Sequence, residues 1–249
     1  MSRSPATGAV GLPKAALDTP ALIVDLDAFD RNVARMAETF RLAGVGWRPH
    51  TKGQKVPALA HRLLAAGAFG VTCAKVSEAE VMAAAGIKDI LIANEVIGEP
   101  KVRRLANLCT QADVAVAVDS PEGINQLQQA AADAGTKPRV VVEVDTGMGR
   151  CGAQPGAPVV DLARRVADTP SLRFAGVMAW EGHCAAIADP AEKRAAVAKA
   201  VGSLVDSAEQ CRAAGLPVEI VSCSGTGTYQ IAATLPGVTE VQAGGGVFG

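Results

Sequence analysis

Lys52 ends a short polar segment, residues 48–52, which reads Arg-Pro-His-Thr-Lys and follows a predicted strand. A lysine that is partly withdrawn from water has a lowered pKa, and its free amine can form a Schiff base with a carbonyl compound. The alternative is a solvated lysine that opens a loop, as Lys55 could be. The position of Lys52 in the sequence leaves both roles open.

Arg150 lies in a glycine-rich segment, residues 143–152, with the sequence Glu-Val-Asp-Thr-Gly-Met-Gly-Arg-Cys-Gly. Glycines permit a tight loop. Such a loop can hold the guanidinium in place, either to bind an anion or to donate to a ring nitrogen. An ion pair with Glu143 or Asp145 is an equally simple explanation. The segment predicts a held arginine and leaves its partner open.

Trp180, Glu181 and His183 follow another predicted strand. The tryptophan could pack against the flat face of a cofactor. The carboxyl and imidazole groups are acid–base candidates by type. A glutamate and a histidine this close in sequence are more often an ordinary loop contact, so the pattern does not assign them a catalytic role.

Two glycine-rich loops lie near the end of the chain, one with Ser224-Gly225-Thr226-Gly227 and one with Gly244-Gly245-Gly246. Backbone N–H groups and Ser or Thr hydroxyls in such loops can surround a phosphate, because glycine lets the backbone approach closely. Gly-Thr-Gly also forms ordinary turns. The two loops together therefore predict a phosphate site better than either does alone.

The elements that must position these residues alternate between strand and helix. A helix over 27–43 with Asp27 as N-cap comes first, and six of the seven connections between the later strands are helical. This count predicts an α/β fold of the TIM type, a (β/α)8 barrel over residues 27–249, whose site lies at the C-terminal strand ends. The barrel strands are expected at 46–48, 70–73, 89–93, 113–118, 139–144, 173–179, 219–222 and 238–242, and a ninth, at 21–24, has no place among them.

A lysine and a held arginine at the barrel mouth, with a phosphate site after the last strands, suit a flat phosphorylated cofactor that forms a Schiff base. Pyridoxal 5′-phosphate (PLP) meets that description. These segments, together with 73–79 (Cys-Ala-Lys-Val-Ser-Glu-Ala) and 93–96 (Ala-Asn-Glu-Val), resemble the D-threonine aldolase family. The resemblance covers essentially the whole chain. That family also contains D-serine dehydratases and 3-hydroxy-D-aspartate aldolases and dehydratases, and it shares its barrel with alanine racemase.

The resemblance implies that Lys52 is the Schiff-base lysine and that Arg150 is the partner of the pyridine nitrogen. Trp180 stands where the family usually has a tyrosine. The remaining cofactor-binding positions implied by the resemblance are His50, Ser224, Gly225, Thr226, Gly227, Gly244 and Gly245.

The activity implied is that of a PLP-dependent lyase that cleaves β-hydroxy-D-amino acids in a retro-aldol reaction, with Lys52 holding the cofactor and moving a proton. Dehydration of D-serine or 3-hydroxy-D-aspartate is the alternative within the family. An alternative of another class is a PLP-binding homeostasis or carrier protein without robust turnover.

The resemblance also implies a second, β-rich domain beyond this chain, in which a histidine and an acidic or sulfur ligand hold a divalent metal such as Mn, Mg or Zn. We expect residues 1–26, with the strand at 21–24, to belong with that domain. The three histidines, His50, His61 and His183, lie in separate segments. No metal site is therefore expected within the chain itself. A homodimer is expected from related architectures.

Composition excludes several classes of protein. Lysines and arginines number 24 against 25 acidic residues, a net charge of −1 over 249 residues, so a polybasic nucleic-acid surface is not expected. The apolar runs are too short to span a membrane, and the N-terminus lacks the apolar core of a signal peptide. Six cysteines without a CxxC pair suggest reduced thiols. A cytoplasmic protein with a small-molecule D-amino acid substrate is the expectation.

Overall fold

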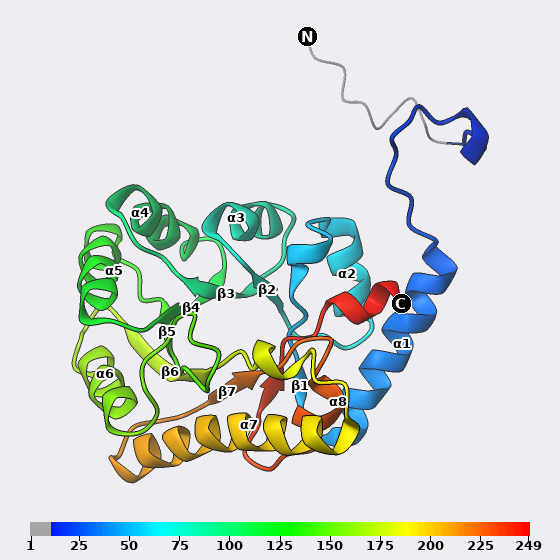
Figure 1. Cartoon of the computed structure of the whole chain (residues 1–249). Coiled ribbons are helices and arrows are strands. Elements are labelled where there is room, and N and C mark those ends of the chain that lie inside the picture. The colour runs from blue at the N-terminus through cyan, green and yellow to red at the C-terminus, as the bar shows by residue number, and fades with distance from the viewer. Residues whose placement is uncertain (1–10) are drawn as a thin grey trace.

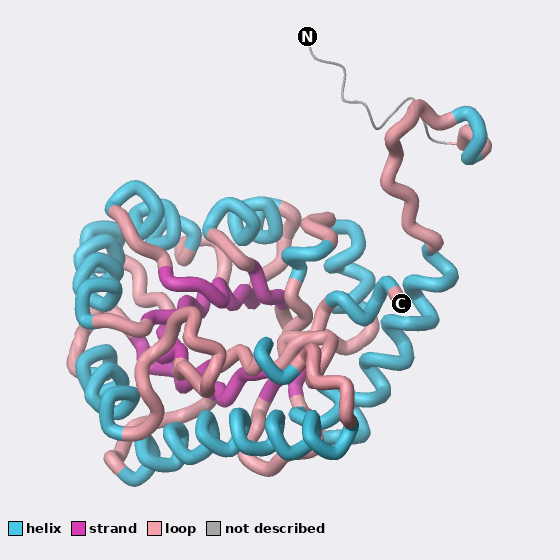
Figure 2. Tube along the Cα trace, in the orientation of Figure 1, coloured by secondary structure: helices cyan, strands magenta, loops and turns pink. Residues whose placement is uncertain are grey.

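The computed structural model describes residues 11–249, in which eight strands form one parallel sheet at the centre of the molecule (Figures 1 and 2). Neighbouring strands follow the order β1-β8-β7-β6-β5-β4-β3-β2. A parallel bridge between His50 and Thr72 connects the segments at the two ends of this order. The predicted (β/α)8 barrel is therefore confirmed. Its strands are β1 Gly46–Trp47, β2 Val71–Cys73, β3 Asp89–Glu95, β4 Asp113–Val118, β5 Arg139–Glu143, β6 Arg173–Met178, β7 Ile220–Cys223 and β8 Glu240–Val241.

Helices surround the strands (Figure 2). Each connection returns the chain to the same end of the barrel, which is why all strands are parallel. The helices are α1 Leu26–Ala43, α2 Pro57–Ala65, α3 Val76–Ala84, α4 Glu99–Leu108, α5 Pro121–Ala134, α6 Ala157–Ala167, α7 Pro190–Ala213 and the short α8 Tyr229–Ala232.

Helix α1 has the predicted apolar stripe, with Phe29, Val33, Met36 and Phe40 buried. Its N-cap is Asp25, whose carboxylate accepts a hydrogen bond from the Ala28 backbone N–H at 3.0 Å. The predicted cap at Asp27 is therefore wrong. Aspartate suits an N-cap and the first turn of a helix equally well, so the two positions look alike in the sequence.

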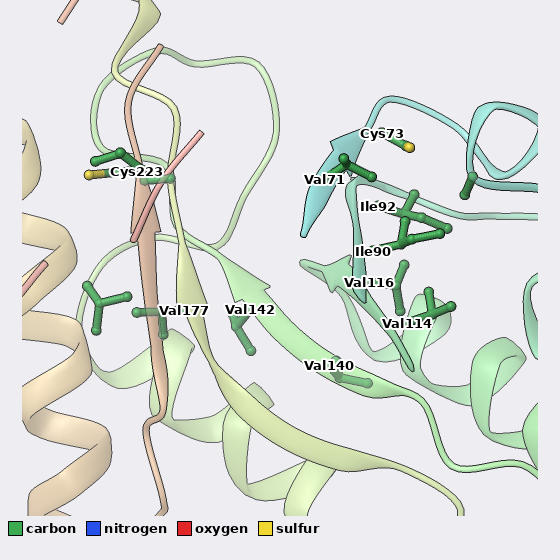
Figure 3. Packing of buried hydrophobic residues seen from close by; sticks show 14 of the residues in the cluster. Val71, Cys73, Ile90, Ile92, Val114, Val116, Val140, Val142, Val177 and Cys223 are labelled. Atoms are coloured by element: carbon green, nitrogen blue, oxygen red, sulfur yellow. The ribbon is translucent and has the colours of Figure 1, made fainter. Parts of the chain in front are cut away.

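Strand residues alternate between two apolar layers. In β4, Val114 and Val116 belong to the large cluster that packs against the helices, whereas Ala115 and Ala117 belong to a smaller cluster inside the barrel. Figure 3 shows the outer layer, to which β3, β5 and β6 also contribute. The inner layer is narrow because alanines fill much of it, and it separates the two ends of the barrel.

Charged residues occupy the barrel end at which the strands begin. Arg48 is almost fully buried and donates to Glu240 at 3.0 Å and to Asp89, while the Phe69 ring lies 4.4 Å from its guanidinium carbon. Arg139 contacts Asp89 and Asp113, both at 2.8 Å. Each of these carboxylates has an arginine partner, so this end is a closed ionic layer. Arg48, although part of the segment around Lys52, belongs to this layer.

The segment Ala21–Val24 pairs with no strand within residues 11–249, and its expected pairing with a second domain stays a prediction. Leu22 is fully exposed, and Ile23 and Val24 are also exposed. The segment runs away from the barrel before α1 begins (Figure 1). A β-branched run becomes a strand only where another strand accepts its hydrogen bonds. No helix in the described part of the chain is long and apolar enough to span a membrane.

Candidate active site

A cavity of about 510 Å³ lies at the C-terminal ends of the strands. It is open at the barrel mouth and is lined by segments that follow six of the eight strands. The ten residues that the sequence predicted for the site all line it: His50, Lys52, Arg150, Trp180, Ser224, Gly225, Thr226, Gly227, Gly244 and Gly245. A larger open groove of about 890 Å³, between α5 and α6 on the outer surface, contains none of these ten.

Lys52 lies in a single 3-10 turn, Thr51–Gly53, that follows β1. The Thr51 hydroxyl donates to the Thr72 carbonyl at 3.0 Å, and Lys55 Nζ donates to the Lys52 carbonyl at 2.7 Å. The second contact ties the turn to Glu78, which lies 2.9 Å from the same Lys55 ammonium. Partial burial and the nearby Arg150 charge lower the pKa of Lys52. A larger fraction of neutral, nucleophilic amine follows.

His50 stabilises the 3-10 turn that contains Lys52. Its Nδ1 accepts a hydrogen bond from the Lys52 backbone N–H at 3.3 Å, which caps the turn. Burial and the neighbouring Lys52 lower the pKa of His50 to about 3, so the ring is neutral near pH 7. A Cβ at position 244 would collide with the His50 carbonyl oxygen, so only glycine allows the last loop to approach this closely.

Arg150 is brought to the same cavity by its glycine loop. Asp145 Oδ1 accepts from the backbone N–H groups of Gly147 and Gly149, both at 3.0 Å, and these bonds lower the pKa of Asp145. Gly147 has a φ of 115° and Gly149 a φ of 64°. Arg150 Nη2 lies 3.4 Å from Glu143 Oε1. The structure thus shows the predicted ion pair with Glu143, and it places the guanidinium at the cavity that Lys52 also lines, whereas a role in binding an anion or a ring nitrogen stays a prediction.

Trp180 forms one wall of the cavity, and glycines pack closely against its indole ring. A Cβ at Gly182 or at Gly225 would collide with the indole ring. A Cβ at Gly227 would come within 2.9 Å of the Ala185 Cβ. Gly225 therefore allows the loop after β7 to pass close to the tryptophan, and Gly227 allows the same loop to pass close to Ala185.

Glu181 organises the loop after β7. It is buried, and its carboxylate accepts from the Thr228 hydroxyl at 2.6 Å and from the Ser224 backbone N–H at 3.2 Å. Burial raises the pKa of Glu181, while these two hydrogen bonds oppose the rise. His183 is exposed and lies beside Gly147. The loop-contact explanation therefore holds for Glu181, which is a positioning residue.

The loops after β7 and β8 meet at the cavity. A Cβ at Gly245 would lie 2.9 Å from Thr226 Oγ1. Ser224 takes a left-handed φ of 71°, which is uncommon for a residue with a side chain. Its hydroxyl oxygen is buried and has no hydrogen-bond partner within residues 11–249. An unpaired buried hydroxyl beside a glycine-lined cradle matches the needs of a bound anionic group.

The family model for the N-terminal domain of alanine racemase matches residues 24–249, nearly the whole chain. The chain belongs to this family. Within it, the chain is 38% identical over 238 residues to a D-threonine aldolase from Arthrobacter sp., covering 96% of this chain and 63% of that protein. It is 35% identical over 233 residues to a D-threo-3-hydroxyaspartate dehydratase from Delftia sp. (strain HT23), covering 93% of this chain and 61% of that protein.

Among solved structures, D-threonine aldolase from Filomicrobium marinum superimposes with a TM-score of 0.93 at 43% identity. The match covers 96% of this chain and 64% of that one. The chain therefore spans less than two thirds of the length of these relatives.

This alanine racemase-type barrel also carries cavity residues that the sequence did not predict as site residues. The clearest is Glu95, at the end of β3, which lies close to Glu143 and Cys151. One oxygen or sulfur atom from each of the three lies within 4.8 Å of the others. A sequence signal existed, because each glutamate ends a strand whose middle is apolar. Arg150 and the Cys151 thiol already donate to Glu143, so we assign no metal to this group. The other cavity residues missed are Gly53, Ala74, Ala93, Asn94, Met178, Ala179, Ala185 and Gln242.

Proposed function

We propose that this chain is the cofactor-carrying barrel of a PLP-dependent lyase that acts on β-hydroxy-D-amino acids. The observation that carries the proposal is the convergence of Lys52, Arg150 and both glycine-rich loops on one cavity of about 510 Å³. A reactive amine, a ring-nitrogen donor and an anion cradle are three separate requirements of PLP. Residues from distant segments of the chain supply all three.

The cavity fits the cofactor at each of these places. The buried Ser224 hydroxyl, unpaired among the described residues, and the space between Gly245 and the Thr226 hydroxyl, which a Cβ at Gly245 would enter, suit the phosphate. Trp180 offers a flat wall for the ring. The amine of Lys52, whose pKa is lowered, suits the aldehyde carbon. Bound PLP supplies an electron sink for the bond that breaks at the substrate Cα.

Each protein group then has a limited task. Lys52 would hold the cofactor, and its Nζ would carry a proton to or from the substrate. Arg150 would donate to the ring nitrogen and, because guanidinium retains its proton, would not protonate it. Glu181 maintains the loop of Ser224 through the two hydrogen bonds described above.

Retro-aldol cleavage is the reaction we favour, because the Arthrobacter and Filomicrobium relatives are D-threonine aldolases. Dehydration is the second candidate, supported by the Delftia relative, a D-threo-3-hydroxyaspartate dehydratase. Divalent-metal assistance to cleavage, through polarisation of the β-hydroxyl, is part of the proposal for the whole enzyme. We assign it to no residue between 11 and 249.

The test is to load the purified chain with PLP and analyse products from D-threonine, D-serine and 3-hydroxy-D-aspartate, with manganese added. Glycine and an aldehyde from D-threonine would support the aldolase. Ammonia and a 2-oxo acid from the other two substrates would support the dehydratase. Near-visible absorbance of bound cofactor without any product would fit a carrier protein and equally a barrel separated from the metal site of the second domain. No absorbance would refute the proposal.

We further propose that residues up to 26 pack against a second body of β structure. The exposed apolar side chains of Leu22, Ile23 and Val24 support this, since such a run favours a covered position. A homodimer and a cytoplasmic location stay predictions. Light scattering of the purified chain tests the first and fractionation of cells tests the second.

A further inference from the structure

Three carboxyl groups lie at the mouth of the barrel over three adjacent strands. Glu95 ends β3, Asp119 follows β4, and Glu143 ends β5. β3 and β5 flank β4, so Glu95 and Glu143 reach toward each other across it. Asp119 is engaged separately, since its Oδ2 accepts from the Gly152 backbone N–H at 3.1 Å.

Glu95 and Glu143 each leave one oxygen unsatisfied. Glu95 Oε1 and Glu143 Oε2 are buried, and neither has a hydrogen-bond partner in the described chain. Glu143 is only 3% exposed. Two ionised carboxylates this close would repel each other and leave both oxygens unpaired. One proton placed between them removes both penalties.

The other contacts decide which glutamate keeps the charge. Glu143 Oε1 accepts from the Cys151 thiol at 3.1 Å and faces Arg150 Nη2 at 3.4 Å. Burial and the adjacent Glu143 raise the pKa of Cys151 to about 12, so the thiol keeps its proton and can donate. Within residues 11–249, no arginine or thiol donates to Glu95. The carboxylate charge therefore belongs on Glu143 and the proton on Glu95.

We propose that Glu95 and Glu143 share one proton and act together as a singly charged acceptor that positions Arg150 at the cavity wall. The charged groups that face the pair are Asp119, Arg150 and, through its hydrogen bond, Cys151. Burial, the Glu143 charge and a hydrogen bond with Glu143 raise the pKa of Glu95 to about 7, in agreement with this arrangement. The pair titrates as a unit.

A cation held by Glu95, Glu143 and Cys151 is the competing explanation. It requires an ionised pair and a thiolate, and the cation would compete for Glu143 Oε1 with Arg150 Nη2 and the Cys151 thiol, which both donate to that oxygen. Arg150, which is 47% exposed, already provides the positive charge next to Glu143. The shared proton accounts for the unpaired oxygens without a further ligand.

The proposal predicts opposite outcomes for two matched substitutions. Glu95→Gln imitates the protonated acid, because its amide can still donate to Glu143. Glu143→Gln removes the carboxylate that receives Arg150. The expected effect on PLP binding rests on the proposed function, whereas the shared proton between Glu95 and Glu143 does not. The exposed Glu99 supplies the control, Glu99→Gln.

The first measurement uses the protein without cofactor. Infrared spectra recorded at mildly acidic and mildly alkaline pH should show the carbonyl band of a protonated carboxyl that disappears on alkalinisation. The band should be absent from Glu95→Gln and present in Glu99→Gln. Absence of that band from the native protein, or its persistence in Glu95→Gln, overturns the proposal.

The second measurement is the dissociation constant of PLP, followed by its absorbance, in variants whose circular dichroism and melting temperature confirm folding. Glu143→Gln should weaken binding about tenfold or more, and Glu95→Gln less than about threefold. Equal weakening by both overturns the proposal. So does stoichiometric zinc or manganese in the native protein that Glu143→Gln abolishes. If the native chain binds no PLP, the proposed function fails while the infrared result still decides the proton.

Discussion

The two ends of the barrel carry similar charges and use them differently. At the end where the strands begin, two arginines contact three carboxylates and each carboxylate has a partner. At the other end, Glu95, Asp119 and Glu143 lie close together, only Glu143 contacts an arginine, and two buried oxygens of this group stay unpaired within residues 11–249. Removing one partner of a buried ion pair destabilises a fold strongly, because the other charge is then left buried and unpaired. Incompletely paired groups have shifted pKa values and are available for chemistry.

The same strands build both ends. In β3 the inner-face residues run from Asp89 through Leu91 to Glu95, and in β5 from Arg139 through Val141 to Glu143. The apolar middle layer keeps the two ionic groups apart, so each end can change without the other. The comparison therefore predicts that substitutions at one end affect stability and those at the other affect cofactor binding and catalysis.

The largest effect expected is at the cavity end. Lys52→Ala should abolish both catalysis and the near-visible absorbance of bound PLP, because no other lysine within residues 11–249 lines the cavity. It should leave the melting temperature nearly unchanged. Borohydride reduction followed by peptide mapping of the native protein should label Lys52. The control is Lys75→Ala. Label on Lys55 or Lys75 with Lys52 unmodified would remove Lys52 from its role.

Substitutions at the end where the strands begin should change the stability of the fold. Arg48→Met leaves Glu240 buried without its partner and is expected to lower the free energy of unfolding by about 3–5 kcal/mol. The exposed Arg173–Glu219 pair, at 2.7 Å, gives a matched control in which Arg173→Met should cost under about 1 kcal/mol. Denaturant titration measures both. Weakened PLP binding in a folded Arg48→Met protein would show that the two ends are coupled.

A smaller effect is expected where a buried carboxylate supports the cavity indirectly. Glu181→Gln keeps one acceptor oxygen and loses the other, so the loop that holds Ser224 loosens. We expect the dissociation constant of PLP to rise about tenfold, which corresponds to one lost charge-assisted hydrogen bond. Isothermal titration measures it. Thr228→Ser keeps the hydroxyl and should bind PLP like the native chain; equal weakening in that variant would contradict the explanation.

The smallest effect concerns pH. The pKa of Glu95 is raised from 4.5 to about 7 in the folded chain, so the folded state binds this proton more tightly than the unfolded state. The stability that this proton contributes to the folded state is therefore fully present at acidic pH and is lost as the pH rises through 7. Glu95→Gln should leave stability unchanged at acidic pH and raise it by about 1 kcal/mol at alkaline pH, given the partial exposure of Glu95. Melting temperatures across pH test this.

His50 provides the contrasting slope. Its pKa is lowered from 6.5 to about 3, so the unfolded chain binds the proton more tightly and stability falls as the pH drops below 6.5. His50→Gln should flatten that acid limb and leave the alkaline limb unchanged. If His50→Gln and Glu95→Gln changed the same limb of the pH–stability curve, the assignment of the two titrations would be wrong.

Much of the fold could be predicted from the sequence, because local patterns carry the information. β-Branched runs, proline at helix starts such as Pro57 and Pro121, and glycines after helix ends mark each βα unit independently of the rest. The cap of α1 could not be chosen, because Asp25 and Asp27 both suit a helix start. The segment 21–24 has strand composition, but hydrogen bonding to another strand decides whether a strand forms.

The residues around the cavity divide in the same way. The sequence by itself determined which groups were available: Lys52 in its polar segment, Arg150 among glycines, and two glycine-rich loops after the last strands. Only the tertiary structure decided that Arg48 belongs to the opposite end, that Glu181 supports a loop, and that Glu95 meets Glu143. The physical reason is that pKa values and ion pairs depend on distance and burial. In a barrel, the order of the strands around the ring sets both the distance between two side chains and their burial. Residues on neighbouring strands can be far apart in the sequence.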